Sequence, residues 1–265
     1  MLAVGFAVVP YAYLSLPDVR QLRAQNPSTT AFMDLRERES HANGKPAVRD
    51  HRWVPYARIS ANLKRAVIVT EDSAFWQHEG VDYEQLRESM EVNWERGEFA
   101  RGASTITQQL AKNLYLSPTK NPLRKVKELL ITRRLEVELS KQRILEIYLN
   151  VIEWGDGVWG AEAAARKYFR KSAAELNASE SALLAAAIAN PHIMDPGSPT
   201  ARLRRRQAMI MRRMGAVTPP PVVAQPTPAP AQLPAVVPGI TLPDVGLPTV
   251  PPLPAPGRGG PGGTR

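Results

Sequence analysis

Cysteine is absent from this chain of 265 residues, so no disulfide holds its fold together. That absence excludes a disulfide-stapled scaffold, but it leaves both an exported and an internal location open. Strand signals are almost absent too, whereas apolar residues recur at helical spacing over much of the sequence. These patterns predict a mainly α fold, with one domain over residues 45–214.

Charge is missing from the first 16 residues, which are mostly apolar. A spanning helix needs about 20 apolar residues, and this run is shorter and contains Pro10. No basic residues precede it, so it lacks the start of a signal peptide. We interpret residues 1–17 as the remnant of a transmembrane anchor, the alternative being a buried helix of a soluble domain. Residues 18–44 are polar, with turn signals at Asn26-Pro27 and Asn43-Gly44, and are predicted to be a linker.

The net charge is +9, and nearly all of it lies before Gly215. A basic surface suits nucleic acid, phospholipid or a phosphorylated substrate. Residues 201–214 form an amphipathic helix pattern with six arginines and Gly215 as its C-cap, and its basic face is either solvated or in contact with anionic lipid. Residues 215–265 hold 15 of the 25 prolines. Such a composition builds no core, so we predict a disordered or polyproline-like tail.

Two carboxylates stand side by side at Glu71 and Asp72. Ser60 is a plausible N-cap for a helix that ends at Glu71. On a continued helix, Glu71, Phe75 and His78 would share one face. A carboxylate beside aromatic surface is partly desolvated, which raises its pKa and suits a general base. The alternative is an exposed helix end with an acidic cap.

A second polar stretch covers residues 101–116. Thr105 and Gln108 have the spacing of a capping box, and Ile106, Leu110 and Leu114 supply a buried stripe. Neither feature explains Gln109, which completes a glutamine pair, or the Lys-Asn pair that follows.

Pro122 suits the first position of the next helix. On that helix Arg124 and Glu128 are four residues apart, so an ordinary surface ion pair is one interpretation. Gly155, Gly157 and Gly160 have the spacing of a dinucleotide site, but they follow a helical run instead of a strand, which excludes that interpretation.

Five stretches in order resemble the five signatures of the glycosyltransferase family 51 peptidoglycan polymerases. They are Glu71-Asp72-xx-Phe75-xx-His78-x-Gly80, Gly102-Ala103-Ser104-Thr105-Ile106-Thr107-Gln108-Gln109-xx-Lys112-Asn113, Arg124-Lys125-xx-Glu128, Lys141-x-Arg143-Ile144-Leu145-Glu146-x-Tyr148-Leu149-Asn150, and Gly157-Val158-Trp159-Gly160 with Ala163-Ala164 and Tyr168-Phe169. No transpeptidase domain follows them, so the resemblance is to monofunctional members.

The resemblance implies a lysozyme-like catalytic lobe with a smaller membrane-associated jaw. It implies a single-pass protein of the bacterial inner membrane, with its catalytic domain on the periplasmic side. Lipid II would be polymerised into β-1,4-linked glycan with inversion and release of undecaprenyl diphosphate. The expected partners are lipid II, the nascent glycan strand, the membrane and proteins of cell-wall synthesis or division, with no nucleic acid and no organic cofactor.

By the same resemblance, Glu71 is the general base and Glu128 the second key carboxylate, which a divalent cation (Mg²⁺ or Mn²⁺) would link to the pyrophosphate. At position 120 a lysine stands where an arginine is expected. The residues expected to bind substrate are Asp72, Ser104, Gln108, Gln109, Lys112, Lys120, Arg124, Lys125 and Arg143. A lytic, glycan-cleaving enzyme of similar fold is the alternative, and a basic nucleic-acid-binding module would explain the charge alone.

Overall fold

The computed structural model describes residues 16–96, 104–116 and 122–216, and within them the chain is mainly helical. The α-helices are α2 (Ala31–Ala42), α3 (Ala61–Glu71), α4 (Tyr83–Arg96), α5 (Ile106–Tyr115), α6 (Pro122–Glu138), α7 (Lys141–Val151), α8 (Ala161–Phe169), α9 (Ala178–Ala187) and α10 (Ala201–Ala216). Short 3-10 helices lie at η1 (Arg20–Arg23), η2 (Tyr56–Arg58) and η3 (Ala173–Glu175), and short strands at β1 (Asp50–His51), β2 (Glu153–Gly155) and β3 (Val158–Trp159).

Local side-chain chemistry sets the starts of the helices that carry the site. The Ser60 side chain accepts a hydrogen bond from the backbone of Asn62 and caps α3. Thr105 and Gln108 form the predicted capping box of α5, and Pro122 is the first residue of α6, as predicted. Each cap satisfies backbone N–H groups that a helix start leaves unpaired.

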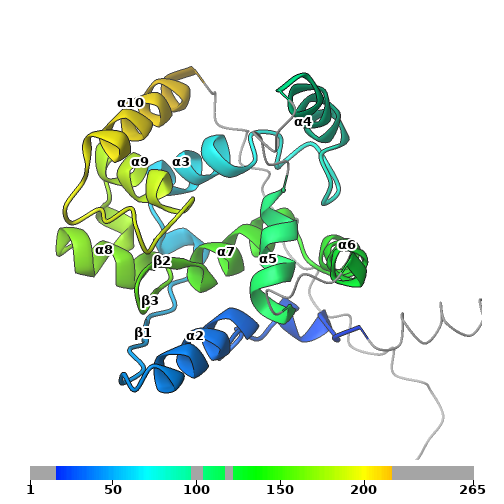
Figure 1. The fold of residues 1–265 in the computed structure, drawn as a ribbon, viewed down its shortest axis with the longest axis horizontal. Coiled ribbons are helices and arrows are strands. Elements are labelled where there is room, and N and C mark those ends of the chain that lie inside the picture. The colour runs from blue at the N-terminus through cyan, green and yellow to red at the C-terminus, as the bar shows by residue number, and fades with distance from the viewer. Residues whose placement is uncertain (1–15, 97–103, 117–121, 217–265) are drawn as a thin grey trace, which may run out of the picture. The chain divides into compact units, whose positions relative to one another are not determined.

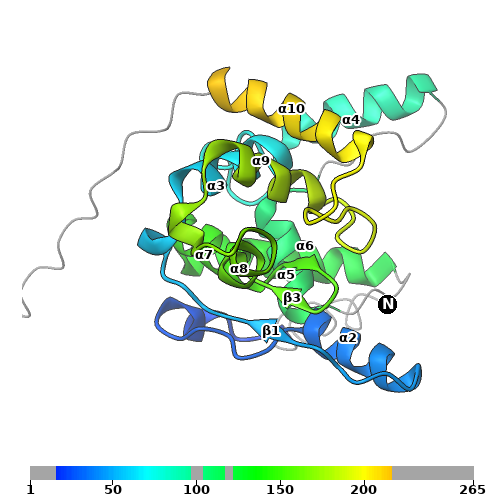
Figure 2. The same cartoon turned by 90° about the vertical axis from the view of Figure 1, so that its left-hand side faces the viewer.

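The helices pack in two groups (Figure 1). Helices α3, α9 and α10 lie against one another, and α5 packs between α6 and α7. Figure 2 shows α2 and β1 beneath both groups. The core joins them through large, fully buried side chains, among them Leu63, Phe75, Tyr148, Trp154 and Trp159. The predicted amphipathic pattern of α10 is confirmed, because a stripe of Leu203, Ile210 and Met214 is buried while most of its arginines are exposed.

The small sheet has the order β1-β3-β2, with β1 parallel and β2 antiparallel to β3. Gly157, in the turn between β2 and β3, has a φ of +67°, and an added Cβ would lie 2.6 Å from the Val48 carbonyl oxygen. Only glycine fits both the conformation and that close approach. The glycine-rich pattern therefore builds a tight hairpin and no dinucleotide site.

Residues 18–44, predicted as a linker, contain η1 and α2. Thr30 caps α2, and Met33 is buried, with 2% of its surface exposed. Helix α2 packs against α5. The segment looked like a linker because α2 is polar on most of its surface and inserts few apolar side chains into the core.

The prediction that Glu71, Phe75 and His78 share one helical face is wrong. The helix ends at Glu71, and residues 72–80 form turns. Asp72 has a φ of −165°, which is extended backbone and ends the helix. Gly215 is not a C-cap either, because α10 continues to Ala216.

Within the described ranges, no helix combines the length and the apolarity that crossing a membrane requires. The predicted anchor falls almost wholly outside the described residues, as do the predicted tail from residue 217 onward and Lys120.

Candidate active site

Glu71 is the last residue of α3, which carries it to the edge of the core. The inner face of the helix is buried through Leu63, Ala66 and Val67, and Phe75 is fully buried just beyond its end. Glu71 itself is only partly buried. Its carboxylate is therefore held by packed structure and still reachable from one side.

The surroundings of Glu71 strengthen its hold on a proton. Burial raises the pKa of its carboxyl group, and the charge of Asp72 acts in the same direction, whereas the hydrogen bond from Gln109 and the charges of Arg206 and Lys112 oppose the shift. The carboxyl end of a helix adds to the effect, because the negative end of the helix dipole repels a carboxylate. A glutamate with a raised pKa is suited to accept a proton near neutral pH.

Gln109 connects Glu71 to a buried tyrosine. Its Nε2 donates to Glu71 Oε2 at 2.9 Å, and its Oε1 accepts from the Tyr148 hydroxyl at 2.7 Å. Tyr148 is fully buried on α7, and burial raises its pKa well above the ordinary value, so the hydroxyl keeps its proton and donates. Tyr148 therefore decides which end of the Gln109 amide faces the carboxylate.

Asp72, predicted to bind substrate, is directed into the protein. Its side chain is fully buried, with Oδ1 2.9 Å from His78 Nε2 and Oδ2 accepting from the backbone N–H of Ile106 at 2.9 Å. The Gly80 N–H donates to His78 Nδ1, so His78 carries its proton on Nε2 and donates to Asp72. Asp72 thus fastens the first signature to the start of α5.

A second carboxylate lies beneath a group of cations. The Glu128 side chain is 2% exposed, and its Oε1 is 2.5 Å from Lys125 Nζ. Burial lowers the pKa of Lys112. The charges of Glu128 and Glu71 act to raise this pKa, whereas those of Lys125 and Arg124 act to lower it. Lys112 therefore feels the negative charge of both Glu71 and Glu128. The interpretation of Arg124 and Glu128 as a surface pair is wrong, because Glu128 is buried and pairs with Lys125.

A divalent cation does not fit the described residues around Glu128. Glu128 already gives one of its oxygens to Lys125, and Glu71, the other carboxylate whose charge acts on Lys112, accepts a hydrogen bond from Gln109. The neighbouring charges of Lys112 and Arg124 are positive and would repel a dication. The positive side chains themselves are therefore the groups available to meet a phosphate.

Gln108, Ser104 and Lys120 were also predicted to bind substrate. Gln108 is buried and caps α5 through its own side chain, so it does not face a substrate. Ser104 is partly exposed and lies just before α5. Its carbonyl oxygen is 3.5 Å from Gln109 Nε2. Lys120 lies outside the described residues.

Arg143 is not at the site. Its guanidinium donates to the carbonyl oxygens of Leu22 at 2.8 Å and Gln25 at 3.0 Å and to the Asn26 side chain at 2.8 Å. It also lies over the ring of Trp53. Arg143 of the fourth signature therefore holds the N-terminal segment against α7 through these hydrogen bonds.

Sequence reasoning missed the roles of Tyr148 and Arg206. Tyr148 appeared only as a member of the fourth stretch, because helical spacing cannot tell which buried side chain has a polar partner. Arg206 was one of six arginines on an amphipathic helix. Its Nε donates to the Ala186 carbonyl oxygen at 3.2 Å, and its charge acts on Glu71. The closeness of Arg206 to Glu71 depends on how α10 packs against α3 and α9, which no local sequence signal reveals.

The chain is similar to known proteins over most of its length. A family model described as Transglycosylase matches residues 38–215. A protein named biosynthetic peptidoglycan transglycosylase from Laribacter hongkongensis is 49% identical over 195 residues, which cover 74% of this chain and 86% of the relative. Proteins of the same name are 50% identical in Dechloromonas aromatica, over 74% of this chain and 84% of the relative, and 50% identical in Herminiimonas arsenicoxydans, over 72% and 82%.

Proposed function

The chain belongs to the transglycosylase family and is a peptidoglycan glycosyltransferase of cell-wall synthesis, and we propose that Glu71 is the general base with which it polymerises lipid II. The single observation that carries this assignment is the partly buried carboxylate of Glu71, whose pKa is raised by burial and whose orientation Gln109 fixes. A base for an alcohol must be oriented, reachable and able to hold the proton it takes.

In this proposal the donor is the growing glycan on undecaprenyl diphosphate, and the acceptor is the 4-hydroxyl of an incoming lipid II. Glu71 takes the hydroxyl proton as the acceptor oxygen attacks C1 of the donor sugar. The bond from C1 to the diphosphate oxygen breaks, and its electron pair leaves with undecaprenyl diphosphate. Attack opposite an α-linked leaving group gives a β-1,4 linkage with inversion.

The negative charge that develops on the diphosphate needs nearby cations. Lys112, Lys125 and Arg124 are proposed for this role, because their charges act on one another around Glu128. The ion pair between Glu128 and Lys125 orients one of these cations in advance. Ser104, partly exposed beside Gln109, remains a proposed contact for the sugar phosphate.

Peptidoglycan synthesis implies a location in the cell envelope. We propose further that the domain works on the periplasmic face of the inner membrane and that the apolar residues 1–16 contribute to its anchor. Exposed apolar side chains support a membrane-facing jaw next to a lysozyme-like lobe. They are Tyr83 (74% exposed) and Met90 (64%) on α4, and Val126 (54%) and Leu129 (45%) on α6.

The test is incubation of the full chain with labelled lipid II, followed by separation of products by size. The proposal predicts long glycan polymers and no release of fragments from finished peptidoglycan. Fragments from finished peptidoglycan, with no polymer from lipid II, would instead identify a lytic enzyme and overturn the proposal.

A further inference from the structure

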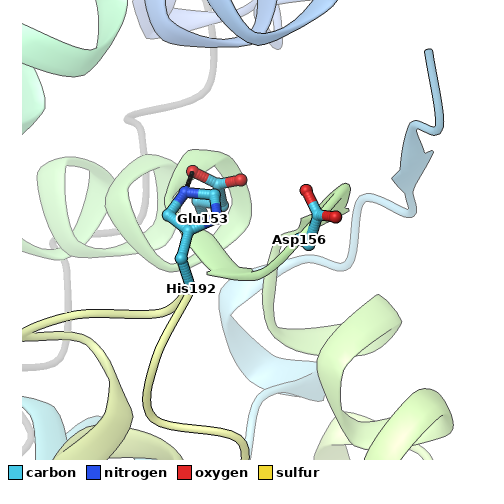
Figure 3. A group of neighbouring side chains, drawn as sticks. All are labelled: Glu153, Asp156 and His192. Atoms are coloured by element: carbon cyan, nitrogen blue, oxygen red, sulfur yellow. Dashed lines mark hydrogen bonds and ion pairs between the residues drawn. The ribbon is translucent and has the colours of Figure 1, made fainter. Parts of the chain in front are cut away.

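Three metal-ligating side chains outside the Glu71 site come together at the β2–β3 hairpin. Glu153 begins β2, Asp156 lies in the turn that follows, and His192 lies in the connection between α9 and α10. One potential ligand atom from each lies within 4.8 Å of the other two. In Figure 3, Glu153 is hydrogen-bonded to His192, and the carboxylate of Asp156 lies across a gap from them.

One oxygen of Glu153 has no hydrogen-bond partner among the described residues. Oε2 accepts from Arg36 Nε at 3.2 Å and lies 3.2 Å from His192 Nε2. Oε1 is buried without a partner, on a side chain that is 7% exposed, and Figure 3 shows it directed toward Asp156. A buried carboxylate oxygen that faces another carboxylate is costly unless a cation or a proton lies between them.

Several carboxylates lie around the trio, and Arg36, Lys45 and Arg49 line the adjoining cavity. Burial, together with the charges of Asp195, Asp156 and Glu153, raises the pKa of the nearby Tyr168 to about 12. Arg36 offsets part of this charge, but it also pairs with Glu39 at 2.7 Å, and it contacts only Oε2 of Glu153. Its hydrogen bond can orient a ligating carboxylate from behind, as outer partners of metal ligands commonly do.

From this geometry we propose that Glu153, Asp156 and His192 bind one divalent transition-metal ion, with zinc as the best match. One imidazole and two carboxylates form a mixed N/O set, which zinc accepts and which magnesium and calcium do not favour. A water molecule would complete a tetrahedral shell.

The distances support the assignment. Ligands of a tetrahedral zinc, with bonds of about 2.0–2.1 Å, lie about 3.3–3.4 Å apart. Glu153 Oε2 and His192 Nε2 lie 3.2 Å apart, a separation of that size, so Oε2 is the Glu153 oxygen already placed to share an ion with His192. Asp156 must close at most about 1.4 Å, the difference between 4.8 and 3.4 Å, and it is an exposed turn residue with room to do so.

A cavity of about 640 Å³ gives the ion a route from solvent. Its lining includes Asp156, His192 and Arg36. A bound ion would tie the β2–β3 hairpin to the connection that leads into α10. Its effect would therefore be on stability, because binding to the folded state alone shifts the unfolding equilibrium.

The experiment titrates the metal-stripped full chain with Zn²⁺ by calorimetry at pH 7.5, and measures melting temperature with and without Zn²⁺. One equivalent should bind, and the melting temperature should rise. Asp156→Asn and His192→Ala should each weaken binding at least about tenfold, since loss of a direct ligand costs no less than loss of an outer partner.

The matched controls are His41→Ala, at an exposed histidine of α2, and Asp195→Asn, at a carboxylate near the cluster but outside the trio. His41→Ala should bind zinc like the parent. Asp195→Asn should weaken binding by well under tenfold, because it removes a nearby charge but no ligand. Absence of saturable binding, or binding that survives both Asp156→Asn and His192→Ala, would overturn the proposal. Neither readout depends on lipid II turnover, so failure here leaves the proposed function untouched.

Discussion

The hydroxyl of Tyr148 offers a test of how Glu71 is positioned. Tyr148→Phe removes the donor to Gln109 Oε1 and leaves the ring in its fully buried place. Without that donor the Gln109 amide is free to rotate, and it holds Glu71 Oε2 for only part of the time. The hydrogen bond from Gln109 lowers the pKa of Glu71, so weakening it raises that pKa.

The magnitude follows from the interaction that is lost. A hydrogen bond to a charged group is worth about 1.5–3 kcal/mol, and one pKa unit corresponds to about 1.4 kcal/mol. Complete loss would therefore move the pKa by about 1–2 units, and partial loss through a rotating amide by about half a unit to one unit. The direction is upward, because the ionised form loses its donor.

The assay measures kcat/KM for lipid II polymerisation from acid to neutral pH. The acid limb reports the pKa of the base in the free enzyme, and in Tyr148→Phe it should move to higher pH. Tyr168→Phe is the matched control, because that hydroxyl donates to the Trp154 carbonyl oxygen and not to the Glu71 chain. An acid limb that stays within about 0.2 units of the parent would refute a positioning role for Tyr148.

Three further predictions separate chemistry from structure. Glu128→Gln should lower turnover at least about tenfold while the fold survives. The double variant with Lys125→Ala should lose less activity than the sum of the two single effects, because the two residues form one ion pair. Additive losses of activity would contradict this. Arg143→Ala should lower the free energy of unfolding by about 1–3 kcal/mol, since it removes donors to residues 22–26. It should leave kcat unchanged at temperatures where the protein is folded. A loss of kcat would show that Arg143 acts at the active site. Gly80→Ala should destabilise by about 1–3 kcal/mol in chemical denaturation, because φ is +91° and the new Cβ would lie 2.7 Å from Thr132 Cγ2; unchanged stability would show that α6 shifts freely.

Much of the fold could be predicted because its signals are local. Caps at Ser60 and Thr105, the proline at 122 and the stripe of α10 each depend on neighbours within one or two helical turns. The linker prediction failed because α2 is polar and its place in the core depends on α5, far along the chain.

The site was predicted in part. The position of Glu71 at a helix end is confirmed, but a motif does not separate residues that face the substrate from residues that hold the motif together. Asp72 and Gln108 satisfy backbone N–H groups at the start of α5, and Arg143 binds the N-terminal segment. Burial and partners distinguish these roles, and both are properties of the folded chain.

The raised pKa of Glu71 also has a consequence for stability. Because its folded-state pKa lies above the ordinary value, the folded protein holds that proton more strongly than the unfolded chain does. Ionised Glu71 therefore destabilises the fold, and its contribution to stability falls as pH rises from the ordinary value through the folded-state pKa.

The most direct measurement of the central claim is lipid II turnover by Glu71→Gln, with melting temperature recorded on the same sample and Glu37→Gln, at an exposed residue of α2, as the matched control. The amide keeps an acceptor for Gln109 but cannot take a proton. Turnover should fall by about 10²-fold or more, while the melting temperature at neutral pH should hold or rise because a destabilising charge is gone. Near-parental turnover by a folded Glu71→Gln protein would show that Glu71 is not the base.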